Sequence, residues 1–280
     1  MQIGGHDIGV CSWSLRPKDL GELVGQMEAL GLQHVQLALR PILFLDDKRK
    51  HQELGHLRTA GVTITAGRIE FPGEDYASIE IIRRSGGYVP DDQWSTRKRL
   101  SEQAARLANE LGVSMVSTHV GFVPRPGEKG YKEMVARVGE VAAAFKSAGV
   151  DLLMETGQEP ADELLQFLND LRGQGAANVF VNFDPANMIL YGAGDPIAAI
   201  NTLGPHIRHV HVKDGTASAN PGKDWGEEVP FGTGQVDARA FLAALKSVGY
   251  TGPLAIEREA GNDRAGDVRV AIDTLRRVGA

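Results

Sequence analysis

VDLLME, residues 150–155, decides the fold, because it is a short apolar run that stops on a carboxylate. Three later stretches have the same form: NVFVNFD (178–184), HIRHVHVKD (206–214) and GPLAIE (252–257). Each stretch reads as a buried strand of a parallel sheet, since such strands are mostly apolar. The repeated pattern predicts βαβ units, in which a helix separates each strand from the next.

The polar residues at these strand ends are of types that bind metal ions. They are Glu155, Asp184, His211 and Glu257, at intervals of 29, 27 and 46 residues. Those intervals suit one strand and one helix per step, with an insertion in the last. A parallel barrel collects its strand ends on one face, so side chains this far apart in sequence can meet there. Three carboxylates and one imidazole would make an oxygen-rich site for one hard or borderline divalent ion.

Strands and helices alternate along the whole chain. The runs that read as strands are Ile8–Trp13, His34–Leu39, Val62–Ala66, Ser114–His119, Val150–Glu155, Val179–Asp184, Ile207–Val212 and Leu254–Glu257. The clearest helical periods are Leu20–Leu30, Arg97–Leu111, Tyr131–Ala148, Glu163–Leu171 and Ala240–Val248. Glycines that suit a left-handed position after a helix are Gly31, Gly61, Gly112, Gly149 and Gly249. We therefore predict an α/β fold, a single (β/α)8 TIM barrel that forms one domain over residues 1–280. No GxGxxG follows the first strand, which disfavours a dinucleotide-binding fold.

Composition excludes several classes of protein. The 280 residues are 42% hydrophobic and 24% charged, with a net charge of −6. An acidic chain argues against a nucleic acid partner, and there is no run of about 18 apolar residues to span a membrane. The N-terminus lacks the basic start and apolar core of a secretory signal. The single cysteine, Cys11, cannot form an internal disulfide, so we expect a cytoplasmic protein.

Strand alternation indicates which side chains face the barrel interior. His209, His211 and Lys213 share a parity, so both histidines can point inward. His211 is nearer the carboxyl end of its strand, where active-site groups of such barrels collect. We therefore choose His211 as the metal ligand and place His209 one layer below.

Other polar residues at strand ends could hold a substrate, and each has a structural alternative. His119 suits either a substrate hydroxyl or a purely structural hydrogen bond. Lys213 suits either a substrate oxygen or anionic group, or an ion pair with Asp214. Arg40 suits either a carboxylate or phosphate, or a salt bridge at the start of a loop.

Two long connections, residues 67–93 and 215–236, suit lids or pocket walls at the carboxyl face of the barrel. Glu70 lies in the first connection and could reach the substrate through it. Trp225 lies in the second and is a possible lid residue. Trp13 suits either an apolar wall against a substrate or ordinary core packing.

The motifs at the strand ends resemble one known family. LLMETG (152–157), NFDPANM (182–188), HVHVKD (209–214) and LAIERE (254–259) are similar to the xylose isomerase-like TIM-barrel family. That family includes ketose 3-epimerases, hydroxypyruvate isomerase and inosose dehydratase, with endonuclease IV as a distant relative. The resemblance is strong over the second half of the chain and rests on architecture alone in the first half.

The resemblance implies a role for each ligand-type residue. One divalent ion, most often Mn²⁺ and otherwise Mg²⁺, Co²⁺ or Zn²⁺, would be bound by Glu155, Asp184, His211 and Glu257. Glu155 and Glu257 would also form the acid/base pair that moves a proton beside a carbonyl. Ketose 3-epimerases place a substrate-binding histidine three residues after the aspartate; Asn187 stands there in this chain, and we expect it to bind substrate. Lys213-Asp214 replaces a Gly-Glu pair and is more similar to inosose dehydratase. Members of the family are often dimers or tetramers, so we expect a homo-oligomer.

The function implied is a metal-dependent epimerase or isomerase that acts on a keto-sugar or keto-polyol. Removal of an α-proton would give an enediolate, with the paired glutamates as acid and base. A hydro-lyase on an oxidised sugar or inosose, which uses the same metal and base, is the main alternative. A phosphodiester-cleaving nuclease would need further histidine and aspartate ligands, and a non-catalytic sugar-binding barrel would not need the four ligands.

Overall fold

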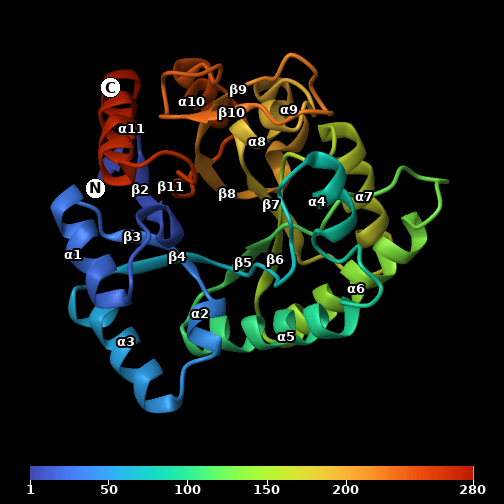
Figure 1. Ribbon diagram of the computed structural model, residues 1–280, viewed down its shortest axis with the longest axis horizontal. Coiled ribbons are helices and arrows are strands. Elements are labelled where there is room, and N and C mark those ends of the chain that lie inside the picture. Colours follow the sequence, from blue (N-terminus) through green and yellow to red (C-terminus); the bar gives the residue numbers. More distant parts are fainter. Residues whose placement is uncertain (280) are drawn as a thin grey trace.

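The computed structural model describes residues 1–279 and contains a closed barrel of eight parallel strands (Figure 1). The barrel strands are β2 (His6–Cys11), β3 (His34–Ala38), β4 (Thr63–Arg68), β5 (Met115–Thr118), β6 (Asp151–Glu155), β7 (Val179–Phe183), β8 (Ile207–Val212) and β11 (Leu254–Ile256). Neighbouring strands pair in chain order, and β2 closes the barrel by pairing with both β11 and β3. A short strand, β1 (Gln2–Ile3), pairs antiparallel with β2. The predicted TIM barrel is therefore confirmed.

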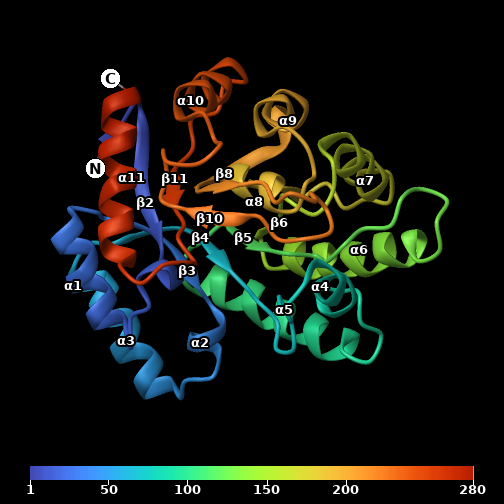
Figure 2. The same cartoon turned by 45° about the horizontal axis from the view of Figure 1, so that its top comes forward.

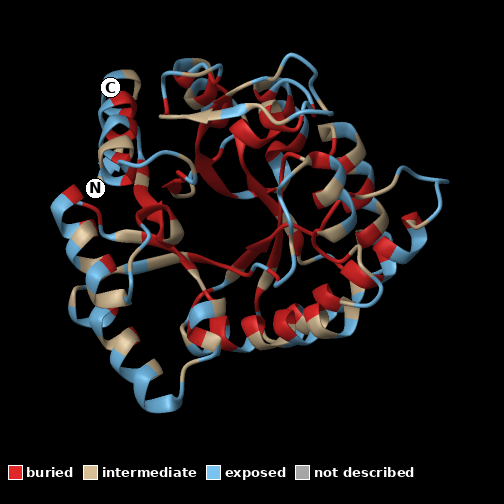
Figure 3. Cartoon of the chain, viewed as in Figure 1, coloured by how far each residue is buried: buried red, intermediate tan, exposed pale blue. Residues whose placement is uncertain are grey.

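Helices surround the barrel, and Figure 2 shows that they lie outside its strands. They are α1 (Leu20–Leu30), α2 (Arg40–Leu43), α3 (Asp47–Thr59), α4 (Ile79–Ser85), α5 (Trp94–Glu110), α6 (Tyr131–Ser147), α7 (Ala161–Gly173), α8 (Pro185–Leu190), α9 (Pro196–Leu203), α10 (Ala238–Ser247) and α11 (Arg264–Val278), with 3₁₀ turns η1 (Ser12–Leu15) and η2 (Gly204–His206). The strands are buried, while the helices expose their outer faces (Figure 3). An apolar layer between strands and helices forms the main core.

Helix ends follow from local sequence. Aspartate side chains cap the first turns of several helices, as Asp19 does for α1 and Asp46 for α3. Each such cap contributes about 1 kcal/mol by satisfying a backbone N–H that has no partner within the helix. The five glycines predicted to stop helices all have positive φ, between 65° and 73°. They can adopt this left-handed conformation without strain because they lack a Cβ.

Strand ends differ from the prediction in ways that affect the site. The first strand ends at Cys11, and Trp13 lies in the 3₁₀ turn that follows. The third strand runs on through Arg68, so this arginine is buried at the barrel mouth. Arg40 does not end a strand; it begins helix α2, because Pro41 suits the first turn of a helix.

The two long connections contain secondary structure of their own. The first carries α4, and the second carries a small hairpin of β9 (Asp214–Thr216) and β10 (Glu227–Val229). Asp214 holds this second connection, because its carboxylate accepts the N–H groups of Gly232, Gly234 and Val236 at 2.9 Å. The connections meet where the Trp225 indole N–H donates to the Tyr76 carbonyl at 3.0 Å.

Candidate metal centre

Four side chains of ligand type converge at the carboxyl end of the barrel. Each of Glu155, Asp184, His211 and Glu257 offers one ligand atom, and these atoms all lie within 4.8 Å of one another. Glu155 ends β6, Asp184 caps α8 directly after β7, His211 lies in β8 and Glu257 follows β11. All four are buried. The sequence prediction that these strand ends meet is correct.

The ring of His211 presents one nitrogen to the carboxylates. Its Nδ1 lies 3.2 Å from Asp184 Oδ2, 3.3 Å from Glu257 Oε2 and 3.6 Å from Glu155 Oε1. The other nitrogen, Nε2, lies 2.6 Å from Gln36 Oε1. Because an amide oxygen only accepts, Nε2 carries a proton, and Nδ1 is the nitrogen that can bind a metal ion once its own proton is displaced.

His209 lies one layer below, as the strand parity predicts. Its Nδ1 lies 2.7 Å from Asn182 Oδ1, and its Nε2 lies 3.0 Å from Thr65 Oγ1. Burial, together with the charge of His211, lowers the pKa of His209 to about 3, so this imidazole is neutral. Both of its nitrogens have hydrogen-bond partners, and it stands apart from the carboxylate cluster.

The two glutamates have different surroundings. Both oxygens of Glu257 accept strong hydrogen bonds, from the Trp13 indole N–H at 2.8 Å and from Lys213 Nζ at 2.8 Å. Glu155 Oε1 accepts from Asn187 Nδ2 at 3.1 Å and lies 3.3 Å from His119 Nε2. Glu155 Oε2 is buried and has no hydrogen-bond partner among residues 1–279. A buried oxygen without a partner is costly, so it marks a place for a cation or a proton.

Charge compensation is tight in this cluster. Burial by itself raises the pKa of Glu155, but the positive charges of His119, His211 and Arg68 outweigh it and lower that pKa to about 2. His211 and Lys213 likewise hold the pKa of Glu257 well below its usual range against the effect of burial. Burial dominates at Asp184 and raises its pKa despite nearby Lys213. The pKa of His211 is well above its usual value, because Glu257 and Glu155 outweigh burial.

The donor set fits a divalent ion. Three carboxylate oxygens and one imidazole nitrogen are typical ligands of Mn²⁺, Mg²⁺, Co²⁺ or Zn²⁺. Cys11, His211 and Glu257 also come close enough to share an ion. Burial raises the pKa of the Cys11 thiol to about 12, however, and a protonated thiol is a poor ligand. The cluster around Glu155 and Asp184 is therefore the better metal centre.

A cavity of about 380 Å³ opens beside the cluster at the carboxyl face. Its lining residues are Arg68, Glu70, Glu74, Tyr76, His119, Asn187, Leu190, Tyr191, Lys213, Trp225, Glu228 and Glu259. Trp225 packs against Tyr191 with ring centres 4.8 Å apart. The second long connection thus supplies a wall of the cavity, as the sequence suggested.

The structure brings most of the predicted substrate-binding residues to this cavity. His119, Asn187, Lys213 and Glu70 line it. Trp13 lies at its edge, where it donates to Glu257 and has the Arg68 guanidinium 4.6 Å from its ring centre. Arg40 does not line the cavity; its guanidinium lies 3.6 Å from Glu70 Oε1, which is the salt-bridge alternative.

Lys213 is held inside the site rather than paired with its neighbour in sequence. Besides Glu257, its ammonium donates to Glu259 Oε2 at 2.9 Å and to Asn187 Oδ1 at 3.3 Å. Asp214 is engaged by the backbone of its own loop, so the proposed pairing of Lys213 with Asp214 is wrong. Lys213 and Asn187 therefore connect the two glutamates through direct hydrogen bonds.

Sequence reasoning missed several residues of the site. Gln36 was the most important, since it is fully buried and orients His211 while its own Nε2 donates to Ser117 Oγ at 2.8 Å. A polar residue inside an otherwise apolar strand was the signal that could have found it. Tyr76, Tyr191 and Glu228 come from connections without a strand-end pattern, and Glu259 lies two residues after the ligand-type Glu257 in the last strand-end motif.

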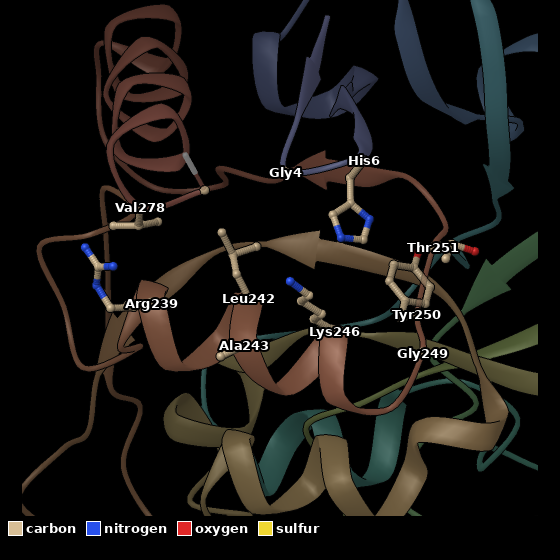
Figure 4. Close-up of a pocket in the computed structure, with 12 residues that line it drawn as sticks. Gly4, His6, Arg239, Leu242, Ala243, Lys246, Gly249, Tyr250, Thr251 and Val278 are labelled. Atoms are coloured by element: carbon tan, nitrogen blue, oxygen red, sulfur yellow. The ribbon is translucent and has the colours of Figure 1, made fainter.

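A larger cavity, of about 510 Å³, lies at the opposite end of the barrel (Figure 4). It is bordered by residues that precede β2 and β11, including Gly4 and Tyr250, and by Arg239 and Lys246 of α10. No carboxylate side chain borders it within the described residues. It therefore lacks the ligand set needed for the chemistry of the four-residue cluster.

Comparison with known proteins agrees with this geometry. The model of the xylose isomerase-like TIM-barrel family matches residues 16–278. The chain belongs to the xylose isomerase-like TIM-barrel family. No match is found among curated proteins.

Several solved structures show the same fold. A xylose isomerase domain protein from Planctomyces limnophilus is 32% identical, with a TM-score of 0.88 over 98% of this chain and 97% of that one. D-psicose 3-epimerase from Clostridium cellulolyticum H10 is 18% identical, with a TM-score of 0.72 over 97% and 99%. A probable 3-DHS dehydratase, AsbF, from Bacillus anthracis is 16% identical, with a TM-score of 0.69 over 96% and 98%. Epimerases and a dehydratase are thus among the structural neighbours.

Among residues 1–279, no helix combines the length and the apolar character that crossing a membrane requires.

Proposed function

We propose that this protein is a divalent-metal-dependent epimerase or isomerase that acts on a keto-sugar or keto-polyol. One observation carries the proposal: two glutamates, Glu155 and Glu257, belong to a buried four-residue ligand cluster beside a polar cavity. Paired carboxylates beside a metal are suited to moving a proton at the carbon next to a carbonyl.

The chain divides the chemical work among its residues. A bound Mn²⁺, or Mg²⁺, Co²⁺ or Zn²⁺ in its place, would polarise the substrate carbonyl and so acidify the neighbouring carbon. Glu155, Asp184, His211 and Glu257 would hold that ion. One glutamate removes the α-proton to give an enediolate. A proton then returns from the side of the other glutamate, to the same carbon in an epimerase or to the neighbouring carbon in an isomerase.

Glu155 is the better proton acceptor of the two glutamates. Its Oε2 has no hydrogen-bond donor within the described chain, whereas both oxygens of Glu257 already accept donors at 2.8 Å. Protonation of Glu257 would compete with one of those hydrogen bonds. We therefore assign removal of the proton to Glu155. On the opposite face, the Lys213 ammonium, which donates to Glu257 at 2.8 Å, supplies the proton that Glu257 passes to the carbon. Glu155 then releases the removed proton to solvent, and Lys213 takes one up.

The remaining polar residues would position the sugar. His119 and Asn187 lie beside Glu155, Lys213 lies beside Glu257, and all three line the cavity, so they would contact the substrate hydroxyls. Glu70 lines the cavity, with Arg40 paired behind it. Trp13 supports Glu257 and closes the edge of the site. These contacts suit a small carbohydrate.

We also propose that the protein is a homo-oligomer, either a dimer or a tetramer. Light scattering of the purified protein would measure its oligomeric state.

A hydro-lyase is the second candidate, and Lys213 favours it. Its ammonium is buried in the cavity, 2.8 Å from Glu257. After Glu155 takes the α-proton, the C–O bond at the β-carbon would break, and a proton from Lys213 would complete the departing water. The substrate would be an oxidised sugar or an inosose with a β-hydroxyl.

The experiment that tests the proposal begins with metal analysis of the purified protein and of Glu257→Gln. We expect about one ion per chain in the wild type and a clear loss in the variant. The loaded wild type is then incubated with a panel of keto-sugars and inososes in D₂O, and the products are analysed by mass spectrometry and NMR. Deuterium uptake with unchanged carbon skeleton supports the isomerase or epimerase, and loss of water supports the hydro-lyase. Failure to bind a metal after reconstitution would rule out both.

A further inference from the structure

A second cavity, of about 360 Å³, lies next to the candidate metal centre. It is bordered by η1, by the chain that leads into α1, by the end of β3 and by α2. These segments follow the carboxyl ends of β2 and β3, so the cavity opens on the same face of the barrel as the metal centre. The roles described above leave it without a ligand.

Only a thin partition separates the two cavities. Trp13 lines the second cavity and donates to Glu257 of the metal centre at 2.8 Å. Arg68, which lines the first cavity, has its guanidinium 4.6 Å from the centre of the Trp13 ring. Glu70 lines both cavities. A ligand that occupies both cavities would therefore cross only the side chains of Trp13, Arg68 and Glu70.

The lining of the second cavity combines an apolar floor with a polar rim. The apolar residues are Trp13, Pro17, Leu20, Leu37, Ala38, Pro41, Ile42 and Leu45. Charged side chains of both signs, including Lys18, Arg49 and Glu53, stand around it. Such a mixture suits a neutral ring with an apolar face and hydroxyl groups at its edge. The balance of signs at the rim gives no preference for an anion.

We infer that the substrate is a glycoside with two rings, and that the second cavity binds the ring that does not react. The oxidised ring occupies the cavity beside the metal centre, and its neighbour extends over Trp13 into the second cavity. Each cavity is near the lower end of the range for ligand sites, roughly 300–1,000 Å³, so each suits one ring. This inference rests on the proposed function, because it places the reacting carbonyl beside Glu155.

The test compares matched ketones with and without a second ring. Methyl glycosides of glucose, galactose and mannose and the corresponding disaccharides are oxidised to the ketone in the non-reducing ring. The kcat/KM for exchange of the α-proton in D₂O is measured by NMR on the metal-loaded protein. We expect the preferred disaccharide ketone to exceed its methyl partner by at least about tenfold, or roughly 1.4 kcal/mol.

Substitutions then locate the preference in the second cavity. Leu45→Trp narrows the cavity, and Pro41→Trp does so from the neighbouring turn in case the first variant is unstable. Phe44→Trp is the matched control, because Phe44 is exposed and does not border the cavity. We expect Leu45→Trp and Pro41→Trp to remove the disaccharide preference without changing kcat/KM for the methyl ketone, and Phe44→Trp to change neither.

The outcomes separate this inference from the proposed function. The two-ring substrate would be overturned if the methyl and disaccharide ketones of every pair had equal kcat/KM. It would also be overturned if Leu45→Trp and Pro41→Trp lowered kcat/KM equally for both ketones. Either result would leave the proposed function standing. Absence of exchange across the panel, with metal bound, would overturn the proposed reaction and this inference with it.

Discussion

The Nε2 atom of His211 lies 2.6 Å from Oε1 of Gln36, a residue 175 positions earlier in the chain. This hydrogen bond fixes a proton on Nε2 and turns Nδ1 toward Glu155, Asp184 and Glu257. Replacing a residue that orients a metal-binding histidine in this way commonly lowers metal affinity by about 10- to 100-fold. Gln36 is therefore a positioning residue for the metal centre.

Gln36→Leu should weaken metal binding by about 10- to 100-fold, because the proton of His211 is no longer fixed on Nε2. Isothermal titration with Mn²⁺ measures the change. The control is Gln33→Leu, since Gln33 is exposed just before the same strand. An unchanged Mn²⁺ affinity in a folded Gln36→Leu protein would show that the contact does not govern the ligand nitrogen.

His211→Ala should lose the metal while retaining most of its thermal stability, whereas His209→Ala should keep the metal. The physical reason is position: His211 Nδ1 faces three carboxylates, and both nitrogens of His209 are engaged by Asn182 and Thr65. Elemental analysis and thermal unfolding of the two variants provide the measurement. If His209→Ala loses the ion and His211→Ala keeps it, the choice of histidine is wrong.

Glu155→Gln and Glu257→Gln should both abolish net turnover but should differ in proton exchange. With saturating metal, Glu257→Gln should still exchange the substrate α-proton with D₂O, because Glu155 remains to remove it. Glu155→Gln should show neither exchange nor turnover, with a loss of at least about 10²-fold. NMR of the recovered substrate measures both. The opposite pattern would assign the base to Glu257.

Metal affinity should rise with pH. Carboxylates raise the pKa of His211 well above its usual value, so in the metal-free protein its imidazole is protonated at neutral pH. An ion that binds Nδ1 must displace this proton. The apparent metal affinity should therefore increase by about tenfold per pH unit, as long as the pH is below the pKa of His211 in the metal-free protein. Mn²⁺ titrations between pH 6 and pH 8, with proton release measured in two buffers, test this. A flat profile without proton release would mean that His211 is not a ligand.

Much of the site was predictable because strand ends in a parallel barrel share one face. Once Glu155 and Glu257 are placed at strand ends, the strand order alone predicts that they lie close together. The interpretation of Arg40 as a strand-end residue was wrong, because β3 ends at Ala38 and helix α2 begins at Arg40 itself. Gln36 was overlooked because nothing in its own strand shows that His211 will lie against it.

The sequence by itself determined the eight strands, the glycine stops and the four residues that converge, because side-chain period and helix ends depend on neighbours a few positions away. The tertiary structure alone decided which nitrogen of His211 faces the carboxylates, which glutamate keeps a free oxygen, and that a second cavity lies behind Trp13. Those properties depend on contacts between residues far apart in the chain, such as Trp13 with Glu257, and only closure of the barrel brings such residues together.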